Sequence, residues 1–187
     1  SSGYMICGVK DSQYGMGYLD SSTGVRSGLD IEYCRAIAAA IGLNPDTDIQ
    51  YVIASGSNRF YLLADGEVDV LIRTTTWTTN RDADLEADYA GINFYDGQGI
   101  MVRSDFITAA DAGNSAYGLD GANICVGIGT TTEGNLEDWF STSGISFASV
   151  GVADASEANA RFIDGSCDAY TGDMSALVAK KYQMVQN

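Results

Sequence analysis

The chain has 187 residues, enough for one domain or two small lobes, with a formal net charge of −15 and a pI of about 4.1. This acidity disfavours nucleic acid and anionic membrane surfaces as partners. The sequence contains no run of about 20 apolar residues that could cross a membrane. It also contains no histidine, which excludes catalysis by Ser–His or Cys–His pairs and removes the commonest general base.

The first half of the chain alternates between short apolar, β-branched runs and segments with apolar residues at helical spacing. Strands are expected at residues 4–9, 49–54 and 68–72, helices at 30–41 and 55–65, and further extended pieces at 88–93 and 98–103. The order β-α-β-α-β predicts a parallel sheet flanked by helices.

The pattern restarts near Arg103, and the second half again alternates between strands and helices. Strands are expected at residues 123–127, 146–150 and 166–170, helices at 134–140, 156–164 and 173–181, and the start of another strand at 182–185. The second half therefore predicts a second α/β layer of the same kind.

The four cysteines, Cys7, Cys34, Cys125 and Cys167, are widely spaced, so the sequence has no CxxC-type zinc or redox motif. Their even number suits two disulfides in an oxidising compartment, whereas four buried thiols would be common in the cytosol. Cys7 and Cys34 fall on the first strand and first helix, and the other two fall on strands of the second half. Of the three possible pairings, Cys7–Cys34 with Cys125–Cys167 is the simplest.

The stretch 68–81 runs from a predicted buried strand into a threonine cluster that ends at Arg81. Ligands of open α/β sheets bind beyond the carboxyl ends of strands, where a guanidinium can bind a carboxylate through two hydrogen bonds. The hydroxyls of Thr74 and Thr76 can complete the shell of such an anion. An ordinary strand followed by a surface turn explains the same residues equally well.

Other candidate binding residues also follow predicted strands. Thr130 and Thr131 precede a helix, whose N-terminal amides can hold a carboxylate or phosphate, although a capping box with Glu133 explains this turn as well. Asp173 can pair with an ammonium group or cap a helix. Two basic residues at strand-to-helix corners, Arg59 and Lys10, are either ligand groups or solvated surface charges.

Five segments that cover most of the chain carry a resemblance to a known family. They are GLDIEYCRAIAAAIG, NRFYLLADGEVDVLIRTTTWTTNRD, YAGINFYDGQGIMVR, ICVGIGTTTEGNL and GSCDAYTGDMSAL. With these segments the chain resembles the extracellular (periplasmic) solute-binding proteins of polar amino-acid ABC transporters, family 3, and is most similar to their general and acidic amino-acid binders.

The resemblance implies a two-lobed α/β fold of the periplasmic-binding-protein type II. In this fold each lobe is a mostly parallel sheet flanked by helices. We expect lobe one over residues 1–102 and lobe two over residues 103–187. The return of the chain to lobe one is expected to be missing from this sequence, and a signal peptide is expected to have been removed.

The resemblance also implies roles for the candidate residues. Arg81 would bind the α-carboxylate of an amino acid, assisted by Thr76 and Thr74. Thr131, beside Thr130 in the turn of lobe two, would donate to the same carboxylate, and Asp173 would accept from the α-ammonium. Two residues, Arg59 and Lys10, fall where acidic amino-acid binders carry basic groups for the ligand side chain.

These roles predict a binding protein rather than an enzyme, one that closes on glutamate, aspartate or their amides and delivers the ligand to an ABC-transporter permease. Its expected location is periplasmic or extracellular. The same module could be the ligand-sensing domain of a receptor or, less readily, a dehydratase or lyase that uses acids such as Glu133. No cofactor, metal, nucleic acid or membrane insertion is expected.

Overall fold

The protein is described by a computed structural model over residues 3–85, 87–106 and 115–186. The chain forms two compact units, Ser1–Tyr95 (unit 1) and Asp96–Asn187 (unit 2), and each is described by itself. Unit 1 contains β1 (Met5–Val9), β2 (Ser12–Gln13), β3 (Gly17–Leu19), β4 (Arg26–Ser27), α1 (Leu29–Ala40), β5 (Ile49–Ile53), α2 (Arg59–Ala64), β6 (Val70–Leu71) and α3 (Thr79–Asp84). Unit 2 contains β7 (Gln98–Val102), the 3-10 helix η1 (Ala116–Leu119), β8 (Ala122–Gly127), α4 (Thr131–Thr142), β9 (Phe147–Val152), α5 (Ala155–Asp164), β10 (Ala169–Asp173) and α6 (Met174–Gln186).

The units divide between Tyr95 and Asp96, not at the boundary 102/103 expected from the sequence. The reason is the pairing of β7, which runs antiparallel to β10 with Ala169 opposite Val102. The sequence places residues 98–102 in lobe one, because they follow that lobe in the chain. Their hydrogen-bond partner is a strand of unit 2, which no local pattern reveals.

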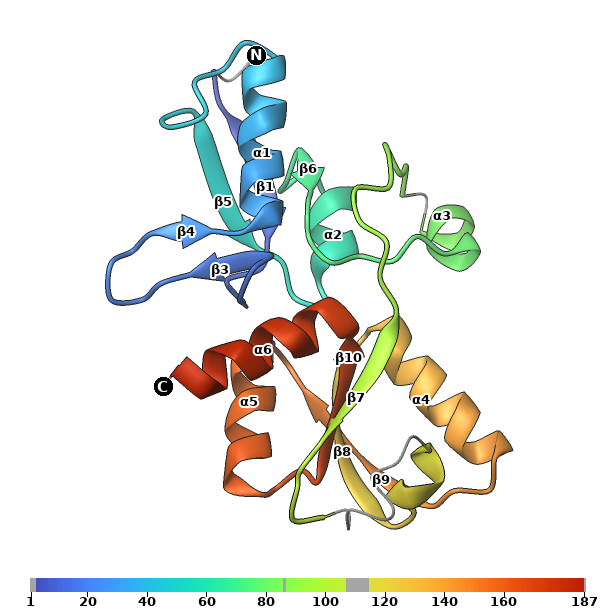
Figure 1. The fold of residues 1–187 in the computed structure, drawn as a ribbon. Helices are drawn as coiled ribbons and strands as arrows, with labels where there is room; N and C mark the ends of the chain where they lie inside the picture. Colours follow the sequence, from blue (N-terminus) through green and yellow to red (C-terminus); the bar gives the residue numbers. More distant parts are fainter. Residues whose placement is uncertain (1–2, 86, 107–114, 187) are drawn as a thin grey trace. The chain divides into compact units, whose positions relative to one another are not determined.

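Unit 1 is built around a parallel sheet of order β5-β1-β6 (Figure 1). Successive side chains of a strand point to opposite faces, and β1 shows this alternation clearly. Its residues Met5, Cys7 and Val9 pack with α1, whereas Ile6 packs in a second cluster around Leu62 of α2. The sheet is therefore covered by α1 on one face and α2 on the other.

A small antiparallel ribbon, β2-β3-β4, joins β1 to α1 and was not predicted. Its strands are only two or three residues long, too short to show an alternating pattern. The chain then passes closely over Met16, because a Cβ built on Gly28 would lie 2.1 Å from the Met16 carbonyl oxygen. With a φ of 111°, position 28 needs glycine on both counts.

Unit 2 is built around a sheet of order β7-β10-β8-β9, in which β10, β8 and β9 are parallel and β7 is the antiparallel edge strand. Figure 1 shows α4 on one face of this sheet and α5 and α6 on the other. The α4 side holds a core that includes Leu136 and Phe140, and the α5 side holds Val152 and Ala158.

Each unit contains one disulfide, and both match the pairing expected from the sequence. Cys7 of β1 is bonded to Cys34 of α1 with the Cα atoms 6.3 Å apart. Cys125 of β8 is bonded to Cys167 with the Cα atoms 5.7 Å apart. Cys167 lies just before β10 and not on a strand, because β10 begins at Ala169. The first bridge therefore joins the sheet of unit 1 to α1, and the second joins the sheet of unit 2 to the segment just before β10.

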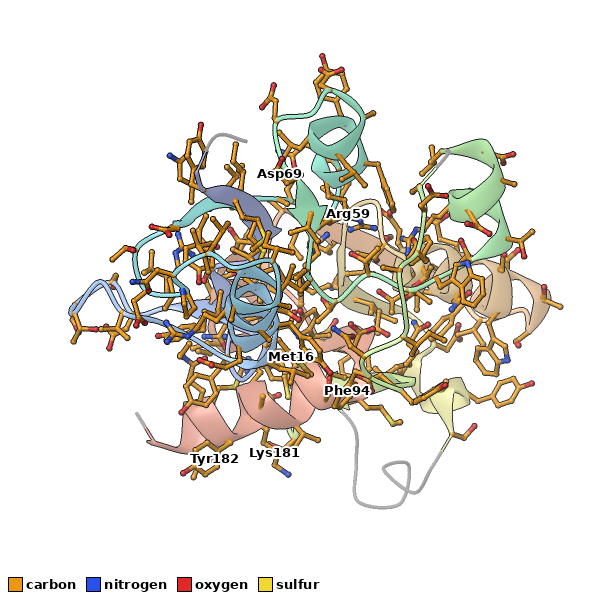
Figure 2. The ribbon with its side chains drawn as sticks, turned by 90° about the horizontal axis from the view of Figure 1, so that it is seen from above. Met16, Arg59, Asp69, Phe94, Lys181 and Tyr182 are labelled. Carbon is orange, nitrogen blue, oxygen red and sulfur yellow. A yellow bond between two sulfur atoms is a disulfide. The ribbon has the colours of Figure 1, made fainter. Side chains whose placement is uncertain are left out.

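Three local expectations were wrong. Residues 79–84 form a helix, α3, that the threonine-rich pattern did not indicate, and residues 88–93 form no strand. Residues 182–185 continue α6, because the apolar residues Met174, Val178 and Tyr182 recur every four residues and so follow a helix. Tyr182 projects from this exposed side of α6 (Figure 2).

Candidate functional site

The carboxyl edge of the unit 1 sheet is lined by cations. Because β5, β1 and β6 are parallel, their carboxyl ends meet at one edge. Lys10 follows β1, and Arg73 lies just beyond β6. Arg73 Nη1 donates to the carbonyl oxygen of Ser55, just beyond β5, at 3.2 Å, so this side chain extends across the end of β1. Lys10 Nζ donates to Gln13 Oε1 at 2.5 Å.

A buried acid, Asp30 in the first turn of α1, lies near these cations and is only 3 % exposed. Burial raises the pKa of Asp30 from its usual 3.8 to about 6, against the opposing charges of Lys10 and Arg73. Its Oδ2 has no hydrogen-bond partner among the residues that the structure describes. Asp30 is a first-turn acid of α1, whose N-cap is Gly28.

Two further arginines of unit 1 share one aromatic ring. The Cζ atom of Arg59 lies 5.0 Å from the centre of the Phe60 ring, and that of Arg81 lies 5.5 Å from the same centre. Both side chains are buried, with 2 % and 8 % exposure. Arg59, labelled in Figure 2, is the first residue of α2. Because it is buried, it is not a solvated surface charge. The ring thus stacks with two guanidiniums that are far apart in sequence.

The threonine-rich turn holds Arg81 in place. The hydroxyl of Thr78 caps α3 by accepting from Arg81 N at 3.2 Å. Arg81 Nη1 donates to the carbonyl oxygen of Thr76 at 2.8 Å, and the Tyr89 hydroxyl donates to the same oxygen at 3.2 Å. Burial raises the pKa of Tyr89, while the nearby charges of Arg81 and Arg59 lower it. Arg81, Arg59 and Tyr89 therefore form one cluster with a fixed geometry.

The threonines of this turn differ in their contacts. The buried hydroxyls of Thr74 and Thr75 have no hydrogen-bond partner within the described part of the chain. Buried hydroxyls in proteins are nearly always paired, so each is a candidate to bind a group from outside the chain. Thr76 is exposed, and its carbonyl is the group that orients Arg81.

In unit 2 the turn before α4 forms a helix cap. The Thr130 hydroxyl accepts from Glu133 N at 3.2 Å and donates to the Gly127 carbonyl at 2.7 Å. The Glu133 carboxylate accepts from Gly129 N at 2.8 Å. The Thr130 contact is the one that a capping box requires, the alternative explanation for this turn, whereas Glu133 reaches the amide of Gly129, one residue before the N-cap. These contacts occupy the Thr130 hydroxyl, so the binding role at this helix start depends on Thr131, the first residue of α4.

The carboxyl edge of the unit 2 sheet also carries acids. Asp173 is the last residue of β10, and Asp154 follows β9 and caps α5 through Ser156 N at 2.7 Å. Burial and, to a lesser degree, the carboxylates of Asp173 and Asp154 raise the pKa of Tyr170 to about 12. Tyr170 thus remains a neutral hydrogen-bonding group near the two acids.

Sequence reasoning missed three polar residues at these edges, namely Arg73, Asp154 and Gln98. Arg73 and Asp154 follow strands directly, the same signal that singled out Arg81, and could have been found by applying it uniformly. Gln98 begins β7 and faces Asp173 across the β7–β10 pair. Its place depends on an antiparallel pairing that the sequence does not show.

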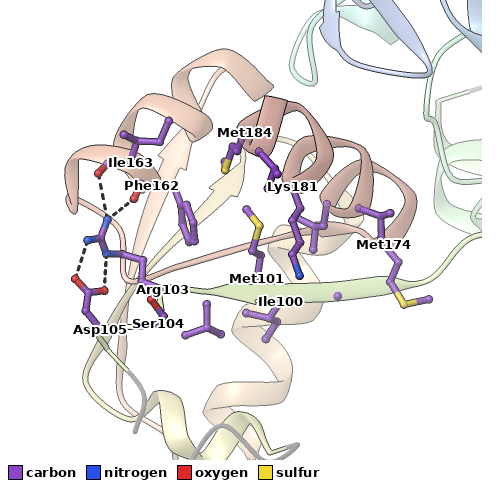
Figure 3. A pocket seen from close by; sticks show the side chains of 15 residues that line it. Ile100, Met101, Arg103, Ser104, Asp105, Phe162, Ile163, Met174, Lys181 and Met184 are labelled. Carbon is purple, nitrogen blue, oxygen red and sulfur yellow. Dashed lines mark hydrogen bonds and ion pairs between the residues drawn. The ribbon is translucent and has the colours of Figure 1, made fainter. Parts of the chain in front are cut away.

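A cavity of about 890 Å³ lies elsewhere in unit 2, between β7, α5 and α6 (Figure 3). Its lining is mainly apolar and includes Met101, Phe162 and Met184. Arg103 at its border donates to the Phe162 carbonyl at 2.6 Å and pairs with Asp105 at 2.8 Å. The described residues that line it include none of the predicted ligand-binding residues, so the cavity is not the candidate site.

Among the described residues, no group of three or more His, Cys, Asp or Glu side chains is arranged to hold a metal ion. No described helix has both the length and the apolar character needed to cross a membrane.

The parallel sheets with polar groups at their carboxyl edges, together with the two disulfides, agree with the family that the motifs suggested. The family model for bacterial extracellular solute-binding proteins, family 3, matches residues 5–116. The chain belongs to this family. Its members are extracellular by description, in agreement with the expected periplasmic or extracellular location.

Individual relatives narrow the comparison. The chain is 42 % identical over 179 residues to the glutamate/glutamine/aspartate/asparagine-binding protein BztA of Rhodobacter capsulatus, covering 96 % of this chain and 51 % of that protein. It is 41 % identical over 177 residues to the general L-amino acid-binding periplasmic protein AapJ of Rhizobium johnstonii, covering 95 % and 50 %. The chain therefore spans about half the length of the curated relatives that it matches.

A solved structure is similar as well. It is an ABC-transporter periplasmic binding protein from Brucella ovis with glutathione bound, 44 % identical, with a TM-score of 0.86 over 97 % of this chain and 55 % of that one. This similarity confirms the expected α/β fold of periplasmic binding proteins.

Proposed function

We propose that this chain is part of a periplasmic or extracellular binding protein that captures a small polar L-amino acid for an ABC transporter. Glutamate and aspartate are the proposed preferred ligands. The relatives named for glutamate, aspartate and their amides support this ligand class. The permease of such a transporter is the proposed partner. The sequence has no histidine to serve as a general base, and we propose binding without catalysis.

The observation that carries the proposal is the pair of buried guanidiniums on Phe60. A dicarboxylic amino acid has two carboxylates, and guanidinium is the side-chain group that binds carboxylate with two parallel hydrogen bonds. We assign the α-carboxylate to Arg81 with Thr76, Thr74 and Thr131, and the side-chain carboxylate to Arg59 and Lys10.

The acids of unit 2 supply the complementary charge for the ligand's ammonium group, and we assign this role to Asp173. Thr130, whose hydroxyl caps α4, contributes by shaping the turn that presents Thr131.

Calorimetric titration with glutamate, aspartate, glutamine and arginine tests the proposal. Arg81→Ala should weaken glutamate binding roughly 100-fold, since a hydrogen bond to a charged group contributes about 1.5–3 kcal/mol. The matched control is Arg35→Ala, which removes an arginine of α1 that pairs with Asp46 at 2.7 Å. If the unaltered protein binds no amino acid, or if both variants bind alike, the proposal fails.

A γ-glutamyl peptide is a second candidate ligand, favoured by the glutathione in the Brucella ovis relative. The glutamate of such a peptide keeps its free α-carboxylate and α-ammonium, so Arg81 and Asp173 can bind it in the same way. The peptide's distant carboxylate would then meet the further cations Lys10 and Arg73. Displacement of bound glutamate by reduced glutathione would support this candidate, and no displacement at millimolar concentration would remove it.

A further inference from the structure

One amide side chain, Gln98 at the start of β7, joins three elements of unit 2. Its Nε2 donates to the Thr132 carbonyl oxygen in the first turn of α4 at 3.0 Å. The same nitrogen donates to the Thr171 hydroxyl on β10 at 3.0 Å. Its Oε1 accepts from Asn135 Nδ2 of α4 at 3.1 Å. Gln98 therefore ties the start of α4 to the strand that ends at Asp173.

The groups that Gln98 binds are themselves fixed. Thr171 is 1 % exposed, and its hydroxyl donates to the Gly99 carbonyl at 2.9 Å, which leaves it to accept from Gln98. Thr132 is 7 % exposed. An amide nitrogen has two hydrogens, and both are used by these contacts. Gln98 is thus a structural bridge and not a donor to a ligand.

The position of this bridge gives it a function. Gln98 lies opposite Asp173 in the β7–β10 pair, and its α4 partner Thr132 immediately follows Thr131. We propose that Gln98 is a positioning residue that fixes the spacing between Thr131, which would bind the ligand's carboxylate, and Asp173, which would bind its ammonium. This inference rests on the proposed function, and it adds a residue that contacts neither end of the ligand.

The physical reason is that rigid spacing lowers the cost of binding. Groups that already stand at the separation of a small zwitterion need not be ordered when the ligand arrives. Without the bridge, the start of α4 is still tied to β8 through Thr130 and the Gly127 carbonyl, whereas the Thr171–Gly99 bond joins only β10 and β7. The first turn of α4 therefore gains freedom relative to β10. We expect the affinity for an amino acid to fall by on the order of tenfold.

The test uses Gln98→Met, which keeps the length of the side chain and removes its hydrogen bonds. The matched control is Asn123→Ala, which removes another bridging amide of unit 2. Asn123 Nδ2 donates to Asp168 Oδ2 at 3.1 Å, and Asn123 lies near the start of β8, away from the carboxyl edge of the sheet. The expected result is about a tenfold weaker affinity for glutamate in Gln98→Met and an unchanged affinity in Asn123→Ala. Equal affinities of Gln98→Met and the unaltered protein would overturn the inference.

A double-mutant cycle separates positioning from general loss of stability. Thr171→Val removes the β10 end of the bridge, so its effect on affinity should not add to that of Gln98→Met. Full additivity would show that the two residues act independently and would contradict the bridge.

Amide hydrogen exchange in the ligand-free protein gives a readout that does not depend on the proposed ligand. Exchange should rise in the first turn of α4 in Gln98→Met and stay unchanged there in Asn123→Ala. Faster exchange without any amino-acid binding by the unaltered protein would contradict the proposed function. Unchanged exchange would contradict the bridge itself.

Discussion

The two units differ in charge at the carboxyl edge of their sheets. Unit 1 presents the cations Lys10 and Arg73 there, whereas unit 2 presents the acids Asp154 and Asp173 beside a helix start. Both units use parallel strands flanked by helices, and each has a disulfide. The difference in charge therefore does not come from a difference in architecture. One layout can thus supply either sign, because the residues just beyond a strand can differ without any change in the strand pattern.

The largest expected effect is on the free energy of unfolding and concerns the disulfides, of which each unit has one. The loops they close span 27 residues in unit 1 and 42 in unit 2. Loop entropy predicts a loss of about 3.5 kcal/mol for Cys7→Ser/Cys34→Ser and about 4 kcal/mol for Cys125→Ser/Cys167→Ser. Urea unfolding should therefore shift more for the second double variant.

The two tryptophans allow each unit to be followed alone, since Trp77 lies in unit 1 and Trp139 in unit 2. Single-tryptophan proteins made by Trp139→Phe or Trp77→Phe report one unit at a time. A serine pair that destabilises only the other unit would contradict the local role of its bridge.

The next effect is on the pH dependence of stability and concerns Asp30, the buried acid near the cations of unit 1. Because the pKa of Asp30 is about 6, the folded protein holds a proton between pH 3.8 and 6 that the unfolded chain has lost. Its contribution to the free energy of unfolding therefore falls as pH rises through this window and is constant above it. Asp30→Asn removes this dependence, so its stability relative to the unaltered protein should rise by about 3 kcal/mol from pH 3.5 to 7.

Chemical denaturation at several pH values measures this difference directly. The comparison cancels the other carboxyl groups, such as Asp48, whose pKa is lowered by the backbone amide of Asn44. A stability difference that does not change with pH would show that folding leaves the pKa of Asp30 at its ordinary value.

The third effect tests whether the extra cations of unit 1 select the ligand side chain. Arg59→Met should weaken glutamate binding about tenfold and glutamine binding by less than about threefold, because only glutamate has the second carboxylate. The control is Arg26→Met, which removes another arginine stacked on a ring, 5.3 Å from the centre of Tyr51. Equal losses for both ligands would contradict selection by Arg59, and Arg59→Lys distinguishes charge from packing.

The smallest effect concerns the hydroxyl of Thr74. Thr74→Val keeps the shape of the side chain, so the free energy of unfolding should not fall, but glutamate affinity should drop about fivefold with the loss of one hydrogen bond. Thr75→Val is a parallel test, since its hydroxyl is buried in the same turn and is likewise a candidate to bind a ligand group. If both variants keep full affinity, the turn binds the ligand without hydroxyls.

Much of the fold could be predicted because the buried strands and the first helix carry strong apolar patterns. The helix α1 buries Ile31, Cys34 and Ala38, as its spacing predicted, although Ile41 at its end is 62 % exposed. Short elements could not be predicted, since the ribbon β2-β3-β4 and the six-residue α3 are defined by caps and tertiary contacts. Tyr182 was misassigned because four residues are too few to separate a strand from the last turn of a helix.

The candidate site was accessible from the sequence only in part. A charged residue just beyond an apolar strand is a local signal, and it indicated Arg81, Asp173 and Lys10. Gln98 gives no such signal, because its importance arises from a strand pairing with residues about 70 positions later, Thr171 among them. Local patterns thus indicate groups that can bind a ligand, but not the groups that position them.

The central proposal is that Asp173 accepts a hydrogen bond from the ammonium group of a bound amino acid. Its most direct test is the affinity of Asp173→Asn for glutamate and for glutarate, which lacks the amino group. Asp120→Asn, which alters a carboxylate bonded to Ser146 N at 2.8 Å, is the control. The account predicts that the unaltered protein and the control prefer glutamate by roughly 100-fold and that Asp173→Asn loses most of this preference. A preference that stays the same in Asp173→Asn would contradict the account.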